Sequence, residues 1–156
     1  MRESKGRRGE GERRGRGVAT GMLLPEFLQS AIPGFPGYGD DESREKSDEY
    51  VRSYVGERLA DLQERLQPLD AALGERIETL LLRSAFVNQA AYKFYAGSDH
   101  SAIDVDAVIA ADSDAVKLAD RASSIGAAQL PQYLDDITRA FDARDAAMSG
   151  ARSVTG

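Results

Sequence analysis

Apolar residues recur at helical spacing from Ser47 onward. In the first such segment the apolar positions are 51, 54, 55, 59, 62 and 66, which lie on one face of a helix. Ser47 is a suitable N-cap, and Pro68 is expected to end this helix or to start the next. Asp48 and Arg52, four residues apart, are expected to pair on the solvent-exposed side.

The remaining pattern predicts three further helices. A second helix is expected over 69–96, where Gly97 provides a C-terminal cap; one helix kinked at Pro68 is the alternative. A third begins after Ser101 or Asp104 and ends before Gly126, with a break expected near 112–114. A fourth is expected over 128–148, with Ile137 in the middle of its apolar stripe.

These segments predict an all-α fold, an antiparallel bundle of about four helices over 47–148. Leu62, Leu80 and Ile137 lie in the middle of three different apolar stripes and are expected to be core residues. Residues 149–156 are expected to fray. Apolar and polar residues nowhere alternate over a stretch long enough to predict a strand.

Residues 22–46 form a proline- and glycine-rich segment that is nevertheless apolar. Three prolines and three glycines within 22–42 exclude a long helix, so an extended course is expected. Phe27, Leu28, Phe35 and Tyr38 are its candidate binding residues. Two alternatives remain: the segment covers the chain's own bundle, which is favoured, or it docks on a partner protein.

Residues 1–21 differ in character from the rest. They hold seven Arg or Lys against three Glu, a net charge of +4. Because the whole chain has a net charge of −6, the residues after position 21 together carry −10. Residues 2–17 contain no apolar residue and are expected to be disordered. A nucleic-acid-binding arm is one interpretation of this stretch. The other is a purine-rich leader translated ahead of a natural start at Met22.

No recognisable catalytic set is present, and the chain is expected not to be an enzyme. Cysteine is absent, and His100 is the only histidine, so no cofactor or metal site is predicted. Carboxylate pairs at 104/106, 112/114 and 135/136 are expected to lie on solvated faces. Aromatic residues cluster at 86, 92, 94 and 95, where one or two exposed rings would indicate a partner surface.

Parts of the chain resemble the C-terminal helical collar domain of bacterial clamp-loader subunits. The resemblance lies in helix order and apolar positions over residues 80–148, in the stretches 82–97, 103–106, 118–119 and 134–140. It implies a helical domain that assembles subunits. The nucleotide-binding module that precedes the collar in that family is absent, because no G-x-x-x-x-G-K-[ST] motif occurs.

The sequence thus predicts a small, non-enzymatic helical interaction or assembly protein. A protein partner or self-association is expected, and nucleic acid only through residues 1–21. No apolar run approaches the ~20 residues of a membrane helix, so no membrane contact and a cytoplasmic location are expected.

Overall fold

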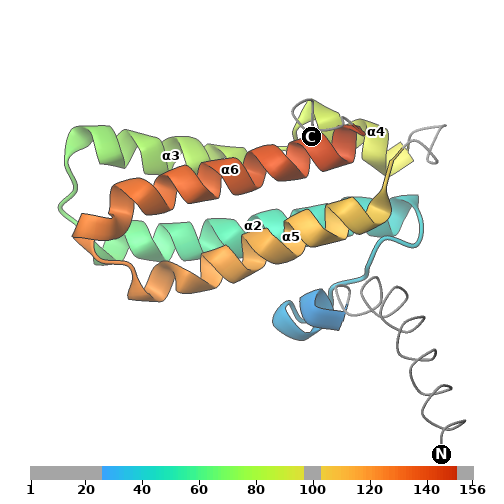
Figure 1. Ribbon diagram of the computed structural model, residues 1–156, viewed down its shortest axis with the longest axis horizontal. Coiled ribbons are helices and arrows are strands. Elements are labelled where there is room, and N and C mark those ends of the chain that lie inside the picture. The colour runs from blue at the N-terminus through green and yellow to red at the C-terminus, as the bar shows by residue number, and fades with distance from the viewer. Residues whose placement is uncertain (1–25, 97–102, 151–156) are drawn as a thin grey trace, which may run out of the picture.

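The computed structural model describes residues 26–96 and 103–150, and the chain forms an all-α bundle (Figure 1). Four long helices form its sides: α2 packs against α3 and α5, and α6 packs against the same two helices. Within the described residues no strand is present. The predicted fold class is therefore confirmed.

Helix α2, Asp41–Arg65, begins before the expected cap at Ser47. Asp40 caps it instead, because its carboxylate accepts a hydrogen bond from the Ser43 backbone N–H at 2.8 Å. Ser47 is buried inside the helix, and its Oγ donates to the carbonyl of Gly37 at 2.5 Å. A charged run before an apolar stripe can thus extend a helix beyond the stripe itself.

The expected second helix is two helices, α3 (Ala71–Ala85) and α4 (Gln89–Ala96). The break lies at Phe86, whose backbone is extended (φ −117°, ψ 146°). It lets α4 turn and pack against α6 and α2, which buries Phe94 and Tyr95. Arg44 of α2 reinforces this contact: its guanidinium donates to the Phe94 carbonyl at 3.1 Å and lies 4.7 Å from that ring's centroid.

Helix α5, Val105–Asp120, and helix α6, Leu130–Ser149, form the other half of the bundle. Asp104, one of the two caps expected, caps α5 by accepting from the backbone N–H of Asp106 at 3.0 Å. The predicted break of α5 at 112–114 is wrong, because Asp112 is buried and paired instead of facing solvent. Short 3-10 turns, Arg121–Ser124 and Ala127–Gln129, join α5 to α6.

Two apolar clusters fill the bundle. The first lies between the four long helices and contains Leu62, Leu80 and Ile137, each at most 3% exposed, as predicted. The second lies where α4 and the N-terminal segment cover the other half of the helices. Its buried members are Leu28, Ile32, Phe35, Tyr38, Val51, Ala91, Phe94, Tyr95, Ile103, Val108, Ile109, Val116 and Met148.

The N-terminal segment packs on its own bundle. Residues 26–31 are helical, and an irregular stretch then runs to α2 (Figure 1). Gly34 and Gly37 have positive φ (82° and 93°), which a residue without a Cβ adopts at low cost. These turns bring Phe35 and Tyr38 against the second cluster, with ring centroids 5.7 Å apart.

No helix in the described ranges has both the length and the apolar character needed to cross a membrane. Predictions for residues 1–21, for His100 and for 151–156 lie outside the described residues.

Candidate functional site

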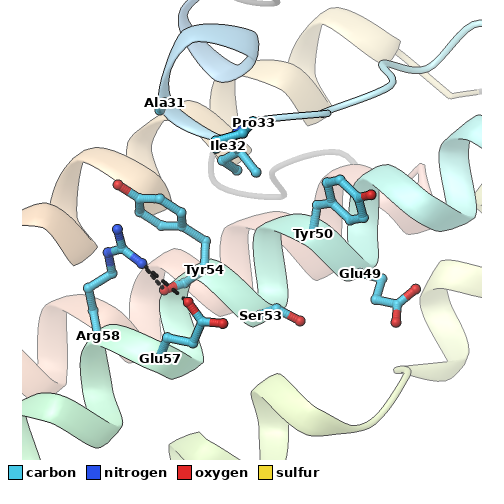
Figure 2. Close-up of a pocket in the computed structure, with 9 residues that line it drawn as sticks. All are labelled: Ala31, Ile32, Pro33, Glu49, Tyr50, Ser53, Tyr54, Glu57 and Arg58. Carbon is cyan, nitrogen blue, oxygen red and sulfur yellow. Dashed lines mark hydrogen bonds and ion pairs between the residues drawn. The ribbon is translucent and has the colours of Figure 1, made fainter.

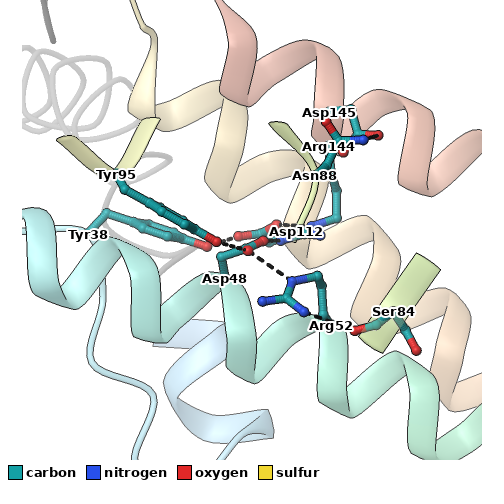
Figure 3. A network of polar contacts seen from close by, with 9 residues as sticks. All are labelled: Tyr38, Asp48, Arg52, Ser84, Asn88, Tyr95, Asp112, Arg144 and Asp145. Carbon is teal, nitrogen blue, oxygen red and sulfur yellow. Dashed lines mark hydrogen bonds and ion pairs between the residues drawn. The ribbon is translucent and has the colours of Figure 1, made fainter. Parts of the chain in front are cut away.

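The centre of the bundle holds a buried ionic network (Figure 3). Arg144 of α6 is 1% exposed and joins two buried carboxylates from different helices. Its Nη2 lies 2.5 Å from Oδ1 of Asp48 in α2, and its Nε lies 2.6 Å from Oδ1 of Asp112 in α5. One guanidinium therefore ties three helices together through charge-assisted hydrogen bonds.

The two carboxylates accept further hydrogen bonds from neighbouring groups. Tyr95 donates its hydroxyl to Asp48, and Tyr38 donates its hydroxyl to Asp112. Asp48 also accepts from Arg52 Nε at 2.9 Å, and Arg52 Nη1 donates to the Ser84 carbonyl at 3.0 Å. The network therefore joins the N-terminal segment, α2, α4, α5 and α6. Each buried charge in it has a partner of opposite charge.

The two carboxylates differ in their pKa. Burial raises the pKa of Asp48, but Arg144, the Tyr95 hydroxyl and Arg52 together hold it below the ordinary value of 3.8. Burial raises the pKa of Asp112 above 3.8, and its contact with Arg144 offsets only part of that effect. Burial and the hydrogen bond to Asp48 also raise the pKa of the Tyr95 hydroxyl.

The expected solvent exposure of Asp48, Arg52 and Asp112 is wrong: they are 1%, 8% and 0% exposed. For Asp112 and for its partner Arg144, a signal for burial was present in the sequence. Asp112 continues the apolar stripe of positions 105, 108, 109 and 116, and position 144 follows 137 and 141 on the stripe of α6. A charged residue on an apolar stripe indicates a buried pair, because a lone buried charge is too costly.

The network resembles a structural clamp more than a catalytic centre. Both carboxylates accept hydrogen bonds from arginines and tyrosine hydroxyls, so neither is available as a general base. Within the described ranges, no group of three or more His, Asp or Glu side chains is arranged to hold a metal ion.

A second candidate is an open hollow of about 360 Å³ between the N-terminal segment and α2 (Figure 2). Ala31, Ile32 and Pro33 form one wall. The other wall comes from α2, where the guanidinium of Arg58 lies 3.4 Å from the ring centroid of Tyr54. Tyr54 donates its hydroxyl to Asp120 at 2.5 Å, so its polar group is committed within the molecule.

A third candidate lies on the surface at the break between α3 and α4, next to the ionic network. Leu82 and Phe86 are four residues apart and are 58% and 67% exposed, and Val87 follows at 36%. We call these three residues the junction surface. A hollow of about 210 Å³ adjoins it, lined partly by Phe86, Val87 and the buried Arg144. Tyr92 of α4 is a further exposed aromatic ring, at 60%.

The structure places the four predicted binding residues mainly in the chain's own interior. Leu28, Phe35 and Tyr38 are 0%, 5% and 9% exposed, whereas Phe27 is partly buried beneath Lys117, whose Nζ lies 5.0 Å from the ring centroid. This is the favoured alternative, in which the segment covers its own bundle. Of the aromatic cluster, Phe86 and Tyr92 are exposed.

Comparison with protein-family models, with curated proteins and with solved structures found no significant match. The fold and the site therefore define the class of protein: an all-α bundle with a buried ionic clamp and an exposed apolar junction. The resemblance to the clamp-loader collar stays a prediction from the sequence.

Proposed function

We propose that this chain is a small, non-enzymatic interaction protein that binds a protein partner through the junction surface. One observation carries the proposal: Phe86, next to Leu82, presents a large aromatic side chain to solvent at a fixed position in the bundle. Exposed aromatic residues beside a hollow are typical of the residues that contribute most to binding in protein interfaces.

The way in which the junction is held supports this role. Phe86 follows directly from α3, and its backbone N–H donates to the Leu82 carbonyl at 3.1 Å. Asn88 donates to Asp145 of α6 at 3.1 Å, which fixes the far side of the break. A preordered surface loses little conformational entropy on binding, so less of the free energy gained from its apolar contacts is offset.

The proposal is tested by capture with the tagged full chain. Partners from the source cells are identified, purified and titrated against wild type, Leu82→Ser and Phe86→Ser. Loss of a central interface side chain is expected to weaken binding by about tenfold or more. Ala72→Ser, an exposed change at the opposite end of α3, is the control and is expected to bind normally.

Circular dichroism and urea unfolding establish that each variant is folded. A purified partner that binds both serine variants as tightly as wild type would refute the proposal. The cytoplasmic location expected from the sequence is part of this proposal and is tested by localising the tagged chain in cells.

A further inference from the structure

Val87 of the junction surface lies between two hollows of different chemistry. The hollow of about 210 Å³ opens towards α6, and one of about 290 Å³ opens towards the N-terminal half of α2. Val87 and Arg52 line both of them. A ligand lying across the α3–α4 break therefore contacts both hollows at once.

The hollow on the α6 side is suited to an apolar side chain. Phe86, Val87, Ala91, Phe141 and Met148 supply its apolar lining.

The ionic groups in this hollow are already paired within the molecule. Arg83 Nη2 lies 2.6 Å from Asp142 Oδ1 and 2.9 Å from Asp145 Oδ2, and Arg144 is committed to the buried network. Since these groups have their partners, an apolar side chain entering here leaves no charge newly unpaired.

The hollow on the α2 side is acidic. Glu45 and Glu49 line it, both are exposed, and they lie one helical turn apart. Among the residues that the structure describes, neither carboxylate has an ion-pair partner. Arg52, the cation of this hollow, is held by Asp48 and by the Ser84 carbonyl (Figure 3).

We infer that the junction binds a peptide segment that is basic and carries an apolar anchor. The anchor enters the α6-side hollow, and its Arg or Lys neighbours meet Glu45 and Glu49. This inference rests on the proposed function and names the partner's chemistry. A second copy of the chain is disfavoured as the occupant, because pairing two copies of this face would bring both sets of glutamates into one interface, while the arginines of the two hollows are already paired within each molecule.

The test uses the full chain and three labelled synthetic peptides of equal length. The first has two leucines among arginines, the second has glutamates in place of the arginines, and the third has serines in place of the leucines. Fluorescence anisotropy is expected to show binding of the first peptide, with affinity falling as salt rises. The other two are expected to bind at least about tenfold more weakly, because each lacks one of the two contacts.

Two double variants locate the contact. Glu45→Gln with Glu49→Gln is expected to weaken binding of the arginine–leucine peptide by about threefold to tenfold, because two exposed ion pairs are lost. Glu64→Gln with Glu75→Gln removes the same charge at the other end of the bundle and is expected to change little. Equal weakening by both pairs would indicate attraction to the overall acidic charge and would refute a site at the junction.

The outcomes separate this inference from the proposed function. If the glutamate peptide binds as well as the arginine peptide, or if no peptide binds, the inference fails, whereas a natural partner lost with Phe86→Ser still supports the proposed function. If the arginine–leucine peptide binds at the junction but natural partners bind Phe86→Ser as tightly as wild type, the proposed function fails. If the serine peptide binds as tightly as the leucine peptide, the apolar anchor contributes nothing and the inference is refuted.

Discussion

The guanidinium of Arg144 in α6 lies 2.5 Å, from Nη2 to Oδ1, from the carboxylate of Asp48, which is 96 residues earlier in α2. These two helices occupy opposite corners of the bundle, since each packs against α3 and α5. The pair therefore spans the diagonal of the bundle, and Asp112 of α5 extends it to a third helix. The two contacts of Arg144 therefore require one particular alignment of α2, α5 and α6 along their axes.

Arg144→Met is expected to lower the free energy of unfolding by about 3–5 kcal/mol, because it leaves two buried carboxylates without their shared cation. Urea denaturation measures the change. Arg139→Met on the exposed face of the same helix is the control, with an expected loss within about 0.5 kcal/mol. The quadruple change Asp48→Leu, Arg52→Leu, Asp112→Leu, Arg144→Met is expected to recover part of this stability, since it removes all four charges of the network together. No recovery would mean that the network stabilises the fold beyond neutralising its own charges.

The stability contributed by the Asp48 charge is expected to disappear in acid. Its folded-state pKa lies below 3.8, so the unfolded chain takes up the proton first as the pH falls. The contribution is therefore complete well above pH 3.8 and is lost as the pH falls through the folded-state pKa. Urea titrations of wild type and Asp48→Asn at several pH values should give a stability difference that is largest near neutrality and shrinks below pH 3.8. A difference that grows in acid would contradict the direction of the pKa shift.

Gly56→Ala is expected to destabilise the protein, although alanine is the better helix former. A Cβ at Gly56 would lie 2.5 Å from Oγ and 3.2 Å from Cβ of Ser84, so the Ser84 hydroxyl would have to leave the Leu81 carbonyl and the contact of α2 with α3 would have to loosen. The expected loss is about 1–3 kcal/mol, typical of overpacking. Gly74→Ala is the matched change: nothing lies within 4 Å of its added Cβ, and helix propensity alone predicts a gain of about 0.5–1 kcal/mol. Thermal unfolding compares the two, and equal effects would argue against the close contact of α2 with α3.

Phe35→Ala is expected to destabilise the isolated chain by about 3–5 kcal/mol, the usual cost of removing a buried phenylalanine. Phe27→Ala should cost less, because that ring is only partly buried. The backbone N–H groups of Ile32 and Phe35 donate to the carbonyls of Leu28 and Ile32, so their hydrogen exchange should be slow in wild type and faster in Phe35→Ala. If Phe35→Ala leaves both stability and exchange unchanged, the segment does not cover the bundle, and the docking alternative gains support.

Hydrophobic periodicity alone was sufficient to predict the fold class and most of the core. Leu62, Leu80 and Ile137 are buried as predicted, because a helix with one apolar face is stable in water only when that face is covered. The cap of α5 by Asp104 was also predictable, since capping depends on residues within one helical turn. Both signals are local and therefore readable along the chain.

The tertiary structure alone decided the break at Phe86 and the pairing in the buried network. Nothing near Phe86 forbids a continuous helix, and the break arises because α4 buries Phe94 and Tyr95 only when it turns towards α2 and α6. Similarly, charges at 48, 112 and 144 stand on apolar stripes, but the sequence does not say which carboxylates meet which cation. Those partners lie on helices far apart in sequence, and their pairing depends on how the packed helices align along the bundle.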